Sequence, residues 1–148
     1  MMSMHMRRYA ACVALLGGCV SLAQAAPTCS NPVGDWGNQL GSTLRITAVQ
    51  PSGQLSGTYT SPSGTTGSAY PLIGWFTNPV AGSTASSNLP AITFSVQWGS
   101  YGSMTAWIGT CDASSGVPTI TTVWHLARTS SQYSWDHLLT NSDVFVPK

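Results

Sequence analysis

Charged side chains are scarce in this chain. They make up 6% of its residues, and glutamate is absent. Two of the five cations, Arg7 and Arg8, lie near the start of the chain. After residue 25 there are three cations and four aspartates, which gives a net charge of −1. Binding of nucleic acid requires a cluster of Lys and Arg that can neutralise phosphates. We therefore expect no nucleic-acid partner.

Long hydrophobic runs are missing after the first 25 residues. Arg7 and Arg8 precede an apolar stretch at 9–20, too short to cross a bilayer as a stable helix, and Ala23-Gln24-Ala25 has the small-x-small pattern of a cleavage site. Residues 1–25 are thus predicted to be a signal peptide and 26–148 one folded domain. We expect the protein to be exported, either secreted or periplasmic, without membrane association.

Cysteines are few once the signal peptide is removed. Cys12 and Cys19 leave with it, and Cys29 and Cys111 remain. Two cysteines in an oxidising compartment most simply pair. We predict a Cys29–Cys111 disulfide.

A helical stripe with a period of 3.6 residues is absent, whereas apolar and small polar residues alternate with a period of two between turn signals. This pattern predicts an all-β fold, an eight-stranded antiparallel up-and-down β-barrel with a mouth at one end. A single helical turn is expected at 134–139. The expected strands are 36–40, 43–48, 55–59, 70–76, 92–98, 103–107, 120–126 and 143–146.

Tryptophan, in contrast, is abundant, with six residues. Burial of Trp requires a packed ring and a partner for its N–H group. Several Trp residues on strands, interleaved with hydroxyl groups and one acid, favour a closed pocket for a compact, uncharged ligand with polar edges. The alternative is that they fill the core. We expect Trp36 to plug the closed end of the barrel and Trp75 to pack on the surface or at an interface.

The inward faces of the predicted strands gather polar side chains at one end of the barrel: Asn38, Ser42, Tyr59, Ser61, Ser103, Thr105 and Asp143. With four of the Trp residues, this set resembles the avidin and streptavidin family, and the resemblance runs from Cys29 to Phe145. The matching stretches are Asp35-Trp36-Gly37-Asn38-Gln39-Leu40-Gly41-Ser42, Leu55-Ser56-Gly57-Thr58-Tyr59, Phe94-Ser95-Val96-Gln97-Trp98, Thr122-Val123-Trp124-His125-Leu126 and Asp143-Val144-Phe145.

The resemblance implies that biotin is the ligand. Asn38, Ser42 and Tyr59 would donate hydrogen bonds to its ureido oxygen, and Asp143 and Ser61 would accept from its two ureido N–H groups. Such charge-assisted bonds are strong where water is excluded.

The rest of the implied site surrounds the sulfur and the acyl chain of biotin. Thr105 would meet the thioether sulfur, and Ser103 and the backbone near Thr65 would hold the carboxylate. The implied apolar walls are Trp98, Trp107, Trp124, Leu40 and Leu126.

The resemblance also implies assembly. Trp135 corresponds to a lid tryptophan that reaches into the site of a neighbouring subunit, so we expect a homotetramer built as a dimer of dimers, with a dimer as the alternative. His125 is expected near a symmetry axis, where its protonation would loosen the assembly.

Catalysis is not expected. Asp143 is the only plausible inward titratable group, and no second acid or His is predicted to face it. A metal site is not expected either, since His125 and His137 have no partners at ligand-like spacing. Two alternatives remain: a secreted β-sandwich carbohydrate-binding module, which would present Trp residues in a row to solvent, and a lipocalin-like carrier of a hydrophobic ligand.

Overall fold

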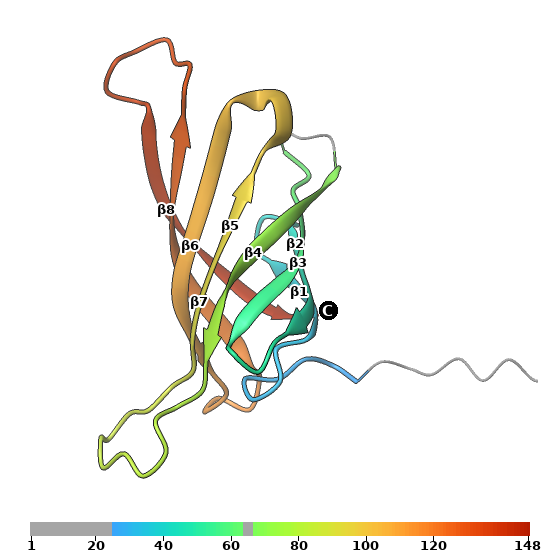
Figure 1. The fold of residues 1–148 in the computed structure, drawn as a ribbon, viewed down its shortest axis with the longest axis vertical. Coiled ribbons are helices and arrows are strands. Elements are labelled where there is room, and N and C mark those ends of the chain that lie inside the picture. The colour runs from blue at the N-terminus through green and yellow to red at the C-terminus, as the bar shows by residue number, and fades with distance from the viewer. Residues whose placement is uncertain (1–24, 64–66) are drawn as a thin grey trace, which may run out of the picture.

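The computed structural model describes residues 25–63 and 67–148 (Figure 1). The strands form one closed barrel in which each pairs antiparallel with the next in sequence and the last pairs with the first, so the predicted fold class is confirmed. The strands are β1 (Gly34–Asn38), β2 (Thr43–Val49), β3 (Gln54–Thr60), β4 (Ala69–Thr77), β5 (Ala91–Gln97), β6 (Ser103–Asp112), β7 (Thr119–Arg128) and β8 (Leu138–Pro147).

Alternation of side chains explains why these segments form strands. In β5, Ile92, Phe94 and Val96 are buried, and the residues between them point outward. Outward Thr93 uses its hydroxyl to donate to the Trp107 carbonyl at 2.8 Å on the neighbouring strand. Each strand therefore has one face for the core and one for the surface.

Several strand bounds differ from those expected: β6 continues to Asp112, and β8 begins at Leu138 instead of residue 143. The first strand begins at Gly34, because the ladder with β2 already pairs Gly34 with Ile46, and it ends at Asn38. Leu40 lies in the following turn, where Gly41 adopts a φ of +82°. The expected helical turn at 134–139 is wrong: turns and bends occupy this segment until β8 begins at Leu138.

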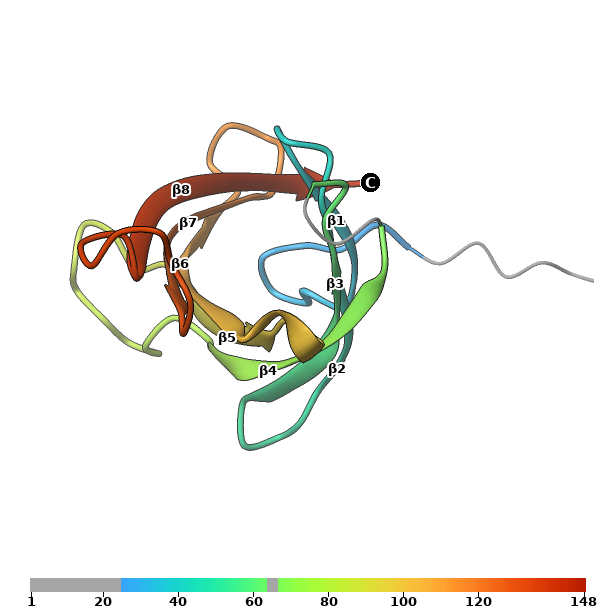
Figure 2. The same ribbon diagram turned by 90° about the horizontal axis from the view of Figure 1, so that it is seen from above.

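The N-terminal segment closes one end of the barrel. In Figure 1 it lies at the opposite end from the β7–β8 loop, and in Figure 2 it crosses the ring of strands in projection. Trp36 is fully buried there, and its indole N–H donates to the Pro32 carbonyl at 2.9 Å. The predicted disulfide between Cys29 and Cys111 is present and fastens this segment to the end of β6.

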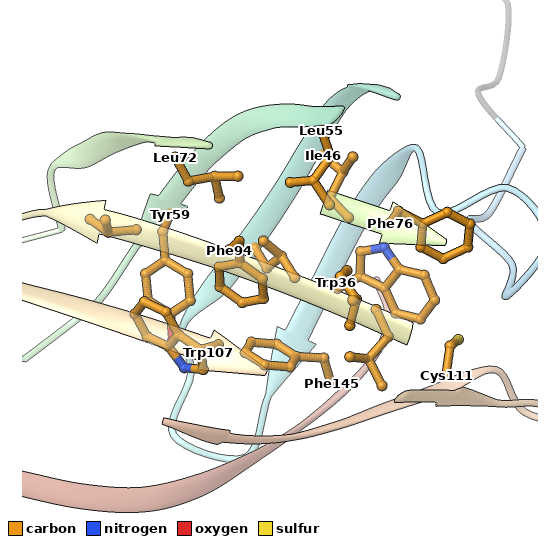
Figure 3. Packing of buried hydrophobic residues seen from close by; sticks show 14 of the residues in the cluster. Trp36, Ile46, Leu55, Tyr59, Leu72, Phe76, Phe94, Trp107, Cys111 and Phe145 are labelled. Carbon is orange, nitrogen blue, oxygen red and sulfur yellow. The ribbon is translucent and has the colours of Figure 1, made fainter. Parts of the chain in front are cut away.

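The core is a column of apolar side chains along the barrel axis. Figure 3 shows Trp36 near Cys111 at one end and Tyr59 beside Trp107 at the other, with Phe94 between them. The column ends at Tyr59 and Trp107, which leaves room at the mouth.

Within the described residues, no helix is long and apolar enough to cross a membrane.

Candidate functional site

A cavity of about 310 Å³ opens at the mouth of the barrel. It lies within the size range of sites for small molecules. Twelve of the fourteen ligand-binding residues predicted from the sequence line it. The lining residues are Asn38, Leu40, Ser42, Tyr59, Ser61, Ser63, Trp98, Tyr101, Ser103, Thr105, Trp107, Trp124, Leu126 and Asp143.

Asp143 is the only carboxylate among these lining residues, and it is only 3% exposed. It lies on β8, where it pairs with Thr122 of β7. Its Oδ2 accepts a hydrogen bond from Trp107 Nε1 at 2.9 Å, whereas its Oδ1 is buried and has no hydrogen-bond partner among the described residues. Buried acceptors are nearly always paired, so Oδ1 is suited to accept from a ligand N–H group.

Asn38, Ser42 and Tyr59 form a polar cluster beside the carboxylate. Asn38 Oδ1 accepts from the Ser42 backbone N–H at 2.8 Å and so fixes the β1–β2 turn, while Asn38 Nδ2 donates to the Tyr59 hydroxyl at 3.4 Å. Burial raises the pKa of Tyr59 to about 12; a hydrogen bond with the Ser42 side chain opposes this rise, and the charge of Asp143 adds to it. Tyr59 is therefore a neutral O–H donor at neutral pH.

Aromatic rings form the floor and one wall of the cavity. Trp107 stacks on Tyr59, with ring centroids 4.8 Å apart, and on Phe94 at 4.9 Å, which keeps the floor rigid. Trp98 meets Tyr59 edge-on at 5.9 Å and donates its indole N–H to Thr105 Oγ1 at 2.8 Å. Because the Thr105 oxygen accepts this bond, its own hydroxyl hydrogen is left to donate elsewhere.

Residues near the mouth are more exposed. Trp124 and Leu126 on β7 are half-buried, and Leu40 is 64% exposed although it lines the cavity. Sequence reasoning missed Ser63 and Tyr101, because both lie in connections where no alternation marks the inward side. The one signal for Tyr101 was an aromatic residue within a short Gly-Ser-Tyr-Gly loop.

Two predicted residues are not among those that line this cavity. Thr65 lies outside the described residues. Trp135 is 77% exposed in the β7–β8 loop and stacks on Tyr133, with centroids 4.6 Å apart. The loop is fastened at its base, where Arg128 Nη2 lies 2.7 Å from Asp136 Oδ2.

The chemistry of the cavity suits binding of a neutral ligand with a polar head. The lining residues that the structure describes include no Lys, Arg or His. Among the described residues, no group of three His, Cys, Asp or Glu side chains is placed to hold a metal ion. One buried acceptor and a cluster of donors lie beside an aromatic floor, so hydrogen bonds can orient a compact molecule while water is excluded.

Fold and cavity together define a class, the antiparallel β-barrels that bind a small molecule at their open end. The avidin family model matches residues 26–148, and the chain belongs to the avidin family.

Solved structures agree with this assignment. Apo shwanavidin is 33% identical, with a TM-score of 0.61 over 77% of this chain and 96% of that chain. The biotin complex of a shwanavidin variant is 32% identical, with a TM-score of 0.61 over 85% of this chain and 100% of that chain. A biotin-binding protein from chicken is 28% identical, with a TM-score of 0.65 over 78% of this chain and 94% of that chain.

Proposed function

We propose that the chain is a biotin-binding protein that holds biotin in the cavity at the mouth of the barrel. The observation that carries this proposal is the buried Oδ1 of Asp143, unpartnered among the described residues, beside the donors Asn38, Ser42 and Tyr59. A urea group presents N–H donors on two sides and a carbonyl acceptor on the third. The cavity offers matching partners, and a similar chain was solved as a biotin complex.

In this arrangement the bicyclic head of biotin lies deep in the cavity. Asn38, Ser42 and Tyr59 bind the ureido oxygen, and Asp143 and Ser61 accept from the ureido N–H groups. A preorganised site loses little conformational entropy when the ligand binds, and tight binding follows.

The remaining contacts run outward from the head. Thr105 meets the sulfur, and Ser103 lies near the carboxylate. Apolar contact comes from Trp98, Trp107, Trp124, Leu40 and Leu126.

The proposed activity is binding, without catalysis. A nucleophile or an acid–base pair is what an enzyme would need, and Asp143 is the only carboxylate among described lining residues that include no His or Lys. The carbohydrate-module alternative gains no support, because Trp98 and Trp107 are buried at the cavity rather than arranged in a row at the surface.

We also propose that the protein assembles as a homotetramer, a dimer of dimers, with a dimer as the alternative. The outward positions of β6, β7 and β8 expose apolar side chains such as Ile108, Val123 and Val144. His125 is the only titratable side chain among the outward residues at 104–110, 121–127 and 138–146. A broad uncharged sheet of this kind favours contact with a second copy.

Export completes the proposal, with residues 1–25 as a signal peptide. The disulfide at Cys29 and Cys111 supports it, because disulfides persist in oxidising compartments. The mass of the protein recovered after export tests it: we expect a chain that begins at Ala26, and an uncleaved chain would contradict export through this peptide.

Thermal unfolding with and without biotin tests the proposed function. A ligand at a thousand times its Kd stabilises the folded protein by about 4 kcal/mol, which raises the thermal midpoint by several degrees. A set of oligosaccharides serves as the matched control. We expect a rise with biotin alone. A rise with an oligosaccharide and none with biotin would contradict the proposal.

A further inference from the structure

Gln39 joins two parts of the barrel through its side chain, next to the residue on which the proposed function depends. It follows the last residue of β1, and its own backbone lies in the β1–β2 turn. Its Oε1 accepts from the Val144 backbone N–H at 3.1 Å, and its Nε2 donates to the Ser142 carbonyl at 3.4 Å. The two residues that Gln39 binds on β8 are therefore those immediately before and after Asp143.

β8 extends beyond β1 toward the mouth of the barrel. The register between the two strands ends where Asn38 pairs with Phe145, whereas β8 begins at Leu138 (Figure 1). Beyond Asn38 the chain turns away, so β1 does not pair with the edge of β8 at 142–144. Backbone groups at such an edge must find partners elsewhere. The Gln39 amide offers one acceptor and one NH2 donor, and it takes the place of a strand residue there.

The other edge of β8 is held by β7 at the same level. Asp143 pairs with Thr122, whose hydroxyl donates to the Asp143 carbonyl at 3.2 Å. Successive residues of an antiparallel strand direct their backbone groups to opposite edges, so Asp143 bonds toward β7 while its two neighbours bond toward Gln39. The backbone that carries Asp143 is thus fixed at both edges.

This fixation matters for the ligand because the position of the carboxylate follows the position of the backbone. Asp143 Oδ2 is tied to Trp107 Nε1 at 2.9 Å, and the buried Oδ1 has no partner among the described residues. With one oxygen tied, a shift of β8 would change the distance and angle that Oδ1 presents to a ligand N–H group. Hydrogen bonds weaken steeply when their geometry departs from the optimum.

We propose that Gln39 is a positioning residue for ligand binding: its side-chain amide completes the edge of β8 and holds the Asp143 carboxylate where the ligand needs it. The effect on biotin rests on the proposed function. Gln39 is not among the residues that line the cavity, so its effect passes through Asp143. Loss of a hydrogen bond of this kind corresponds to about a two- to tenfold change in an equilibrium constant, and we expect a change of this size in biotin dissociation.

Gln39→Met tests this role, because Met keeps the length of the side chain and removes both its donor and its acceptor. The NMR resonance of the Trp107 indole N–H in the ligand-free protein reports on the carboxylate, since this group donates to Asp143 Oδ2. We expect Gln39→Met to shift this resonance and to speed biotin dissociation by about two- to tenfold. Thr47→Val is the matched control, because Thr47 is also exposed and its hydroxyl donates to the Ser56 carbonyl at 3.1 Å on another strand pair. It should change neither quantity.

A double variant separates action through Asp143 from a general loosening of the barrel. If Gln39 acts through the carboxylate, Gln39→Met should add little to the faster biotin dissociation expected of Asp143→Asn. Full additivity of the two changes, an unshifted Trp107 resonance, or unchanged biotin dissociation in Gln39→Met would overturn the inference. If the unmodified protein binds no biotin, the proposed function fails instead. The Trp107 resonance of the ligand-free protein still tests the positioning of Asp143 in that case, so the two failures are distinguishable.

Discussion

Replacement of Asp143 by Asn separates the binding role of this residue from its structural role. Asn has almost the same shape as Asp, and its Oδ1 can still accept the hydrogen bond from Trp107 Nε1 that Asp143 Oδ2 accepts at 2.9 Å. The Asn Nδ2 then takes the place of the buried Oδ1, which has no partner among the described residues. A donor would thus face the ureido N–H of biotin where an acceptor stood.

The magnitude follows from the bond that is lost. A hydrogen bond to a charged group contributes about 1.5–3 kcal/mol, which corresponds to about a 10- to 150-fold increase in Kd. Two opposed donors in a site without water add to this cost. We therefore expect Asp143→Asn to weaken biotin binding at least about tenfold.

Dissociation kinetics with labelled biotin would measure this change, and denaturant unfolding without ligand would serve as the control. Asp143→Ala is the matched variant, because it also removes the acceptor for Trp107 Nε1 and leaves a buried N–H group unpaired. We expect Asp143→Ala to lose both binding and stability, whereas Asp143→Asn loses chiefly binding. If Asp143→Asn binds biotin as the unmodified protein does, the assigned role of Oδ1 is refuted.

Three further results are expected. Because burial raises the pKa of Tyr59 from 10 to about 12, the unfolded chain loses this proton first, so the contribution of Tyr59 to stability should be constant below pH 10 and fall between pH 10 and about 12. Denaturant unfolding at pH 8 and 11 checks this, and the Tyr59→Phe variant should lack that part of the fall. Replacement of both Cys29 and Cys111 by Ser should cost about 4 kcal/mol of unfolding free energy, because the bond closes a sequence separation of 82 residues, and an unchanged denaturation midpoint would contradict this. Trp135→Ala should weaken both biotin binding and assembly, and a change in sedimentation alone would make Trp135 an interface residue only.

Much of the barrel could be predicted from the sequence because burial follows alternation. Ile92, Phe94 and Val96 alternate with polar residues, and the structure buries all three. The same parity placed Thr105 and Trp107 on the inner face of β6, where they line the cavity. Asp143 is predictable in the same way, since it shares a face with buried Phe145 on β8.

The connections were less predictable, because their conformation depends on contacts made far away in the sequence. Tyr101 ends the short 3-10 helix η1 (Gly99–Tyr101), next to Gly102, whose carbonyl accepts two hydrogen bonds from Thr129, and no local pattern indicates that partner. The segment at 134–139 was expected to form a helical turn, but Arg128 binds Asp136 through both its carboxylate and its backbone carbonyl and holds the chain in a different shape. Leu40 was expected at the end of a strand but lies in a turn, because the Asn38 side-chain oxygen accepts a hydrogen bond from the Leu40 backbone N–H at 3.0 Å.

Calorimetric titration of residues 26–148 with biotin tests the central claim most directly. The cavity at the mouth, with its buried carboxylate Asp143 and its cluster of donors, predicts one biotin per chain and a large favourable enthalpy. Loss of most of this heat in Asp143→Asn, with the fold intact, would place the ligand in that cavity. No heat with the unmodified protein, or full heat in the variant, would contradict the account.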